Sequence, residues 1–161
     1  MKIAGKTALI TGAARGIGQA IAVELARREV HIIGVDLDLE DLQETANLVT
    51  GLGRNFKPFA CDVVNEDDIR RLVSKTQQTG GFDILINNAG VLPSGPFDSR
   101  DFEAWRRVLD INLTGLMAIT HATLAILKAR GEAHIVNIAS VAGKFGTEGV
   151  AAYAASKHGV V

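Results

Sequence analysis

The chain has 161 residues, 47% of them hydrophobic, which is enough apolar material for the core of one domain. Its formal net charge is −1 and its basic residues are scattered, which argues against a nucleic acid or an anionic membrane as partner. Cys61 is the only cysteine, which excludes an internal disulfide and a cysteine cage for a metal.

Five short β-branched or aliphatic runs predict strands. In chain order they are Thr7–Ile10, Val30–Val35, Phe56–Cys61, Phe82–Ile86 and His134–Ile138. Longer segments with helical spacing lie between them, at Gly16–Arg28, Leu39–Leu52, Glu66–Gln78 and Asp101–Arg130. Because apolar strands alternate with helices, the pattern predicts a parallel sheet covered by helices on both faces.

These elements predict an α/β fold, a Rossmann-type doubly wound parallel sheet with strand order 3-2-1-4-5. Pro58 cannot donate a ladder hydrogen bond, which suits the third strand at an edge of the sheet. We expect residues 1–161 to form a single domain. His158–Val161 fall in the first turns of a crossover helix, so we also expect the domain to be incomplete at its C-terminus, without strands six and seven.

A glycine-rich segment, Thr11–Gly18, follows the first predicted strand and opens the first helix. Its glycines at 12, 16 and 18 allow a tight turn and a close approach of the backbone, and the helix N-terminus offers N–H groups to a phosphate. The spacing is Gly-x-x-x-Gly-x-Gly, which differs from the common Gly-x-Gly-x-x-Gly fingerprint. A purely structural turn is the alternative. We favour a phosphate cradle, in which Arg15 could pair with a phosphate.

Asp36 ends the second predicted strand, where a carboxylate can accept hydrogen bonds from both hydroxyls of an adenosine ribose and repel a 2′-phosphate. This position favours NAD over NADP, although Arg15 weakens the discrimination. The alternative role for Asp36 is to cap the following helix. Asp38 could equally be that cap and leave Asp36 free.

Small and polar residues follow the next two strands. Asp62-Val63 ends the third strand, where the carboxylate could accept from an adenine amino group while the valine packs on the ring; a plain turn is equally compatible with the spacing. Asn87-Asn88-Ala89-Gly90 ends the fourth strand, at the expected crevice for a cofactor. Asn112 lies inside a predicted helix, where asparagine is disfavoured, and this breach of local preference hints at function.

Tyr153 and Lys157 are four residues apart, so a helix would carry both side chains on one face. A phenol has a reference pKa near 10, and a nearby ammonium favours its phenolate form, which suits it to proton transfer. Ser140, a short distance upstream, can donate a hydrogen bond to an oxygen that gains negative charge when a carbonyl is reduced. An ordinary helix surface is the alternative for the Tyr-Lys pair alone.

Together these motifs resemble the short-chain dehydrogenase/reductase family, over a stretch from about Thr7 to the last residue. The resemblance implies catalytic roles for Asn112, Ser140, Tyr153 and Lys157. It implies cofactor contacts from Thr11, Gly12, Arg15, Gly16, Ile17, Gly18, Asp36, Asp62, Val63, Asn88, Ala89, Gly90, Tyr153 and Lys157.

The individual roles also follow from the resemblance. Tyr153 would be the acid/base, and Lys157 would favour its phenolate form and bind the nicotinamide ribose. Ser140 would position the substrate oxygen, and Asn112 would hold a water that links Lys157 to solvent. Thr11 would brace the glycine turn.

The expected function is oxidoreduction between a carbonyl and a secondary alcohol with NAD, or less favourably NADP. A non-catalytic nucleotide-binding or interaction module is the alternative, because family members continue for roughly half as much chain again; a related isomerase or dehydratase is a third possibility. We expect a small-molecule substrate, no nucleic-acid, membrane or metal partner, a cytoplasmic location, and a homodimer or homotetramer in the full-length form.

Overall fold

The structure is a computed structural model that describes residues 2–99, 101–146 and 148–161. In this part of the chain five strands form one parallel sheet in the order β3-β2-β1-β4-β5, as predicted. The strands are β1 (Thr7–Thr11), β2 (His31–Asp36), β3 (Phe56–Ala60), β4 (Ile84–Asn87) and β5 (His134–Asn137). The edge position of β3, inferred from Pro58, is confirmed.

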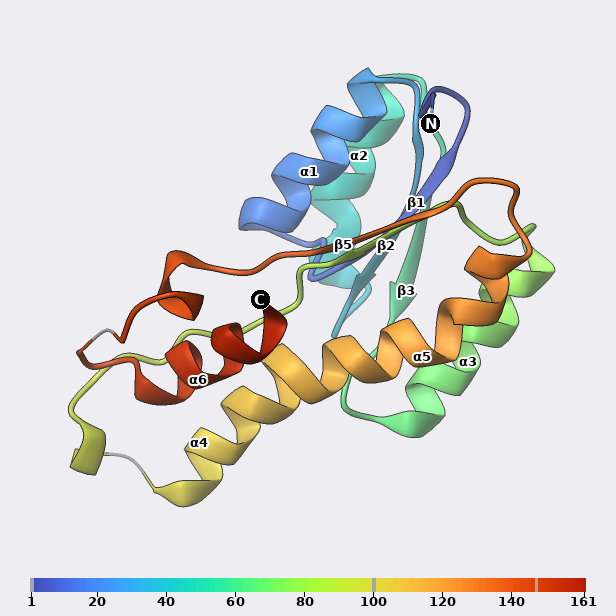
Figure 1. The fold of residues 1–161 in the computed structure, drawn as a ribbon. Helices are drawn as coiled ribbons and strands as arrows, with labels where there is room; N and C mark the ends of the chain where they lie inside the picture. The colour runs from blue at the N-terminus through green and yellow to red at the C-terminus, as the bar shows by residue number, and fades with distance from the viewer. Residues whose placement is uncertain (1, 100, 147) are drawn as a thin grey trace.

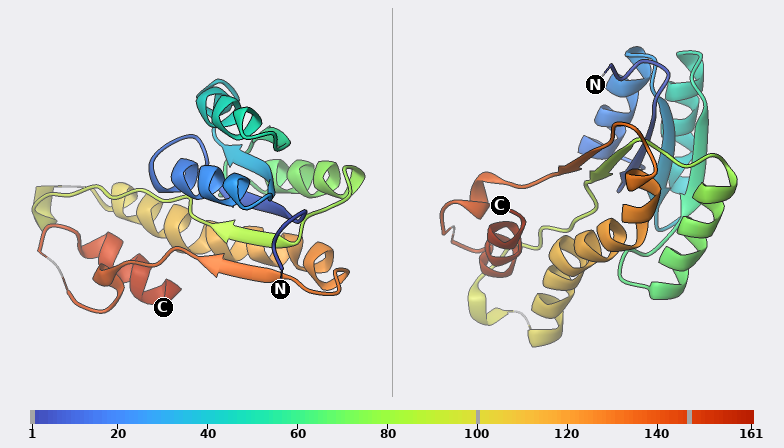
Figure 2. Two further views of the ribbon diagram at one scale, coloured as in Figure 1. Left: turned by 90° about the horizontal axis from the view of Figure 1, so that it is seen from above. Right: turned by 45° about the vertical axis from the view of Figure 1, so that its right-hand side comes forward.

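Helices cover both faces of the sheet (Figures 1 and 2). The α-helices are α1 (Gly16–Arg27), α2 (Gln43–Gly51), α3 (Glu66–Gln78), α4 (Phe102–Leu109), α5 (Leu116–Lys128) and α6 (Ala151–Val160). Short helical turns are η1 (Glu40–Leu42), η2 (Phe97–Ser99) and η4 (Val141–Gly143), and the π-helical segment η3 (Asp110–Gly115) joins α4 to α5. Figure 1 shows α1 and α2 on one face, α3 and α5 on the other, and α4 and α6 extending beyond the end of the sheet.

The core consists of two apolar layers, one on each face of the sheet. Successive residues of a strand point to opposite faces, so Ala8 and Ile10 of β1 pack under α1 and α2, whereas Leu9 packs under α3 and α5. All three side chains are fully buried. This two-sided burial explains why the strand sequences are almost continuously apolar.

In the described part of the chain, two of the α-helices begin with a side-chain cap. Asn65 accepts hydrogen bonds from the N–H groups of Asp67 and Asp68 at the start of α3, and Asp101 accepts one from Ala104 at the start of α4. Because each cap satisfies N–H groups that have no intrahelical partner, these two helices begin close to where the sequence pattern places them.

The longest helical stretch, Phe102–Lys128, has the length and mean hydropathy of a membrane span. In the structure it packs on α3 and α6, and Val108, Ile119 and Leu127 are buried within the domain. The sequence predicts helical spacing from Asp101 to Arg130, with a loop at its start as a possible division. The structure instead inserts the π-turn at η3, the segment that carries Asn112.

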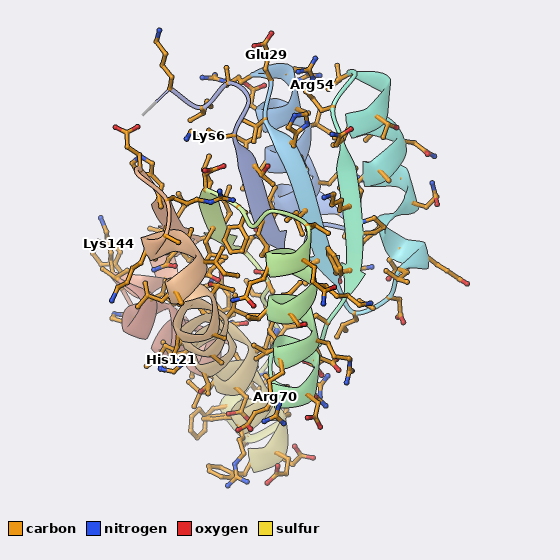
Figure 3. All side chains as sticks on the ribbon, turned by 90° about the vertical axis from the view of Figure 1, so that its right-hand side faces the viewer. Lys6, Glu29, Arg54, Arg70, His121 and Lys144 are labelled. Carbon is orange, nitrogen blue, oxygen red and sulfur yellow. The ribbon has the colours of Figure 1, made fainter. Side chains whose placement is uncertain are left out.

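A polar cluster closes the amino end of the sheet. The buried carboxylate of Asp83 accepts a hydrogen bond from the Thr7 N–H at 2.9 Å and lies 3.6 Å from both the Lys6 ammonium and the Arg130 guanidinium. Arg130 also donates to the carbonyl of Phe82 at 3.1 Å. Lys6 is seen at this end of the molecule in Figure 3. These bonds tie β1, β4 and the end of α5 together.

Candidate active site

A cleft of about 390 Å³ lies at the carboxyl ends of the strands, a volume typical of a small-molecule site. Its walls come from the loops that follow all five strands, from α4 and η3, and from α6. The lining residues are Gly12, Arg15, Ile17, Val35, Asp36, Leu37, Cys61, Asp62, Val63, Asn88, Ala89, Gly90, Val91, Leu92, Arg107, Ile111, Ile138, Ala139, Tyr153 and Lys157. The cleft thus brings together residues from both halves of the sheet.

Two glycines of the loop, Gly12 and Gly18, leave no room for a side chain. Gly12 has a φ of +66°, and a Cβ on Gly18 would lie 2.0 Å from the Gly12 carbonyl oxygen. No side chain caps α1, so the N–H groups of its first turn remain available to an anion. The loop therefore fits a phosphate cradle, and a dinucleotide diphosphate is a group that it can hold.

Asp36 stands at the rim of the cleft with its carboxylate fixed by the backbone. One oxygen accepts from the Ala14 N–H and the other from the Leu37 N–H, each at 2.9 Å. Neither Asp36 nor Asp38 caps the following helix, so the capping alternative is wrong; Leu39 is the N-cap residue of η1, which has no side-chain cap. Asp36 links the glycine loop to the end of β2 and remains half-buried in the cleft wall.

Asp62 and Val63 also line the cleft, beside Cys61. The Asp62 carboxylate accepts from the Val64 N–H at 3.1 Å. This bond forms a local turn, which is the alternative role that the sequence allows for Asp62. Burial, reinforced by the charges of Asp68 and Asp62, raises the pKa of the Cys61 thiol to about 12. This thiol stays protonated at neutral pH and is unsuited to nucleophilic chemistry.

The ends of β1 and β4 are joined by two side chains. The Thr11 hydroxyl accepts from the N–H groups of Asn88 and Ala89, each at 3.0 Å. The Asn88 amide donates to the carbonyls of Thr11 and Gly12, also at 3.0 Å each. Asn88, rather than the Thr11 hydroxyl, therefore contacts the glycine turn directly, while Thr11 secures the loop after β4.

Asn112 is buried in the π-turn and holds the chain that leaves β4. Its amide oxygen accepts from the Val91 N–H at 2.8 Å, and its amide nitrogen donates to the Val91 carbonyl at 2.9 Å and to the Ser156 hydroxyl at 3.1 Å. Ser156 in turn donates to the Tyr153 carbonyl at 2.7 Å. Both amide hydrogens are used, so the side chain links the cleft wall to α6, and the predicted role with a water stays a prediction.

Tyr153 and Lys157 lie on one face of α6, and both line the cleft. The Lys157 ammonium is 5.8 Å from the centre of the Tyr153 ring and donates to the Ile138 carbonyl at 2.6 Å. Burial lowers the pKa of Lys157. The pair therefore has the shared orientation that its spacing predicts.

Ser140 does not line the cleft, and neither do the predicted site residues Thr11, Gly16, Gly18 and Asn112. Its hydroxyl accepts from the Ala142 N–H at 3.2 Å and caps the turn η4, while its neighbours Ile138 and Ala139 line the cleft. The serine lies on the loop that leads from β5 toward Tyr153. This bond uses only an acceptor lone pair of the hydroxyl, so its hydrogen stays available for the predicted contact with a substrate oxygen.

Sequence reasoning missed several residues of the cleft. Arg107 and Ile111 lie one helical turn apart and both line it, a spacing that could have revealed them once α4 was placed. Ser156 does not line the cleft, but it is buried and links Asn112 to the Tyr153 carbonyl, and no feature of the sequence marks it. Among the described residues no group of three or more histidine, cysteine or acidic side chains could hold a metal ion.

Relatives of known function match the whole chain. A 3-oxoacyl-(acyl-carrier-protein) reductase, FabG of Vibrio cholerae, is 37% identical over 162 residues, covering 100% of this chain and 65% of the relative. The cyclohexanol dehydrogenase of Acinetobacter is 35% identical and matches 99% of this chain and 64% of its own length. The chain therefore spans slightly under two thirds of these curated relatives.

Solved structures match as well. Carveol dehydrogenase from Mycobacterium avium in complex with NAD superposes with a TM-score of 0.88 at 34% identity, covering 99% of this chain and 63% of that one. A metagenomic short-chain oxidoreductase in complex with NADP gives 0.90 at 32% identity, with 99% and 73% covered. The family model for short chain dehydrogenases matches residues 6–161. The chain belongs to the short-chain dehydrogenase family.

Proposed function

We propose that the protein carrying this chain is a nicotinamide-dependent oxidoreductase that interconverts a carbonyl and a secondary alcohol on a small molecule. The observation that carries this proposal is the sharing of one cleft by the glycine loop, Asp36, Tyr153 and Lys157. When bound, the nicotinamide cofactor supplies or accepts the hydride.

Tyr153 exchanges the proton that accompanies this transfer. The centre of its ring lies 5.8 Å from the Lys157 ammonium, and both side chains line the cleft, so both can reach a substrate oxygen held there. Lys157 is held by the Ile138 carbonyl and is oriented toward the same cleft. Ser140 assists by donating its hydroxyl hydrogen to the substrate oxygen, while its own oxygen keeps accepting from the Ala142 N–H.

NAD is the preferred cofactor in this proposal. The Asp36 carboxylate, fixed by the N–H groups of Ala14 and Leu37, is suited to accept from two ribose hydroxyls and repels a 2′-phosphate. Solved relatives are known with either cofactor, one with NAD and one with NADP, so the preference rests on this chain's own residue.

The cofactor assignment is tested by fluorescence titration of the intact protein with NADH and NADPH. We expect Asp36→Asn to weaken NADH binding while NADPH binding improves or stays unchanged, since one repulsive charge is removed. Equal losses for both cofactors would contradict the preference, and no nucleotide binding by the unmodified protein would contradict the assignment itself.

The proton-transfer role is tested by Tyr153→Phe, which keeps the ring and removes the hydroxyl. Turnover on a panel of alcohols and ketones should fall by orders of magnitude, with the Kd for NADH unchanged. Retained turnover would remove Tyr153 from the mechanism. The homodimeric or homotetrameric assembly and the cytoplasmic location remain part of the proposal for the full-length form.

A further inference from the structure

Five charged side chains line the cleft, and none of them forms an ion pair with another described residue. They are Arg15, Asp36, Asp62, Arg107 and Lys157. Asp36 and Asp62 accept only backbone N–H groups, and the Lys157 amine donates to a backbone carbonyl. The charges of this wall are thus not neutralised by one another within the described chain.

Most of the arginines elsewhere in the described chain form ion pairs with carboxylates. Arg28, Arg70, Arg71 and Arg130 all pair with nearby carboxylates. Arg15, Arg54 and Arg107 lack a carboxylate partner among the described residues. Arg54 lies with Lys6 and Glu29 at the far end of the molecule (Figure 3), so both remaining unpaired guanidiniums line the cleft.

Arg107 and its neighbour Arg106 provide an internal contrast. Arg106 lies 3.4 Å from the Glu103 carboxylate and over the Phe102 ring, and it does not line the cleft. Arg107 points to the cleft on the same side of the helix as Ile111, one turn further on. The two residues carry the same charge on the same helix, but only one of them faces the site.

The two unpaired arginines approach the cleft from different parts of the fold. Arg15 belongs to the glycine loop that leads into α1 on one face of the sheet, whereas Arg107 belongs to α4, which continues into α5 on the other face (Figure 1). An anion held between them would have a cation on each side. A diphosphate carries two negative charges and accepts hydrogen bonds from guanidinium groups in bidentate geometry.

The sign of the cleft depends on Arg107. The cations that line the cleft are Arg15, Arg107 and Lys157, and the carboxylates are Asp36 and Asp62. Without Arg107 the cations and the carboxylates would be equal in number. A cleft of net positive charge attracts an anionic ligand, and a neutral one does not. Arg107 therefore supplies the excess positive charge of the cleft.

We propose that Arg107 is a second cationic residue for the diphosphate of the dinucleotide, binding it from the α4 side of the cleft. This inference rests on the proposed function, since it requires that the cleft take a dinucleotide. Arg107 has no part in proton transfer, and it acts on affinity. Its contribution should therefore appear with any ligand that carries the diphosphate and vanish with one that lacks it.

The test compares Arg107→Gln with Arg106→Gln in the intact protein, by calorimetric titration with ADP and adenosine and by fluorescence titration with NADH. Both variants remove one positive charge from the same helix, so their overall charge is matched. We expect Arg107→Gln to weaken ADP and NADH binding about tenfold, to leave adenosine binding unchanged, and to reduce the salt dependence of the ADP affinity. Arg106→Gln should bind all three ligands as the unmodified protein does, and Arg107→Lys should recover part of the loss.

Equal weakening of ADP binding by both variants would overturn the proposal, because the loss would then come from the reduced positive charge of α4 and not from a contact of Arg107. Equal weakening of ADP and adenosine by Arg107→Gln would also overturn it, by showing a change in cleft shape. Failure of the proposed function has a different signature: the unmodified protein would bind neither ADP nor NADH.

Discussion

The two ends of the sheet treat their charged residues in opposite ways. At the amino end, Asp83 is buried among Lys6, Arg130 and the Thr7 N–H, and its charge is met on several sides. At the carboxyl end, Asp36 and Arg107 line a cleft and have no ion-pair partner among the described residues. The amino end uses charge to hold strands together, whereas the carboxyl end keeps it available for a ligand.

Because of this difference, substitutions at the amino end should change the stability of the fold, and substitutions of unpaired charges at the carboxyl end should change ligand affinity. Removing a buried, paired carboxylate destabilises the fold, because its cationic partners are left without an opposite charge. An exposed charge without a partner contributes little to folding, so its removal should change binding alone. Asp83→Ala probes the amino end. Gly18→Ala, Thr11→Val and Cys61→Ala probe the carboxyl end.

The largest effect on stability is expected for Asp83→Ala. Thr7 would lose its acceptor, and Lys6 and Arg130 would lose their common carboxylate, which should lower the free energy of unfolding by about 3 kcal/mol. Urea denaturation measures this loss, and the Kd for NADH should stay unchanged. Asp67→Ala is the matched control, since its partner Arg70 is exposed on α3 and stability should hardly change. Weaker NADH binding by Asp83→Ala would break the separation between the two ends.

Gly18→Ala should affect both stability and binding. The added Cβ would lie 2.0 Å from the Gly12 carbonyl oxygen, so the glycine loop must shift, at a cost of about 2 kcal/mol in stability. NADH affinity should fall at least tenfold as the N–H groups of the loop move. Gly51→Ala, at the end of α2 with open space around it, should keep full affinity. Normal NADH binding by Gly18→Ala would remove the glycine loop from the site.

Thr11→Val keeps the shape of a buried side chain and removes the acceptor for two N–H groups. Asn88 and Ala89 would be left without that partner, which should lower the free energy of unfolding by about 1.5 kcal/mol and loosen the loop after β4. Thermal denaturation together with NADH titration measures both consequences. The exposed Thr50→Val on α2 serves as control. Unchanged stability would show that water replaces the hydroxyl and that the two strand ends are not joined as described.

The smallest expected effect concerns pH and Cys61. Its pKa is raised from 9.0 to about 12 in the folded chain, so above pH 9 the unfolded chain releases the thiol proton first and is stabilised. Stability should therefore fall as the pH rises from 9 toward 12. Cys61→Ala should remove this part of the slope in denaturation curves taken across that range. An identical slope in both proteins would contradict the burial of this thiol.

The fold was predictable because its signals are local and repeated. Apolar strands alternating with helices, together with Pro58 at an edge, indicate the order of the sheet, and the structure confirms it. The boundaries are less well determined: β4 begins at Ile84 rather than Phe82, because Phe82 and Asp83 belong to the polar closure of the amino end. The π-turn at Asn112 leaves no pattern in the sequence beyond one asparagine in an otherwise regular helix.

The site was predictable only where a motif carries it. Gly12, Asp36 and Tyr153 follow from strand ends and spacing, and the structure brings them to one cleft. Arg107 was missed because an arginine on a helix has no distinctive context until the neighbouring helices are placed. Ser140 shows the converse, since its position in the sequence does not reveal that its hydroxyl accepts from the Ala142 N–H and caps a helical turn.

A ¹H–¹⁵N NMR titration of the protein with NADH tests the contrast between the two ends most directly. The amide signals of Gly12, Ile17, Leu37 and Ala89 should shift progressively with NADH, whereas those of Thr7 and Asp83 should stay in place. Shifts centred on the amino end, or no shift at the glycine loop at saturating NADH, would contradict this contrast.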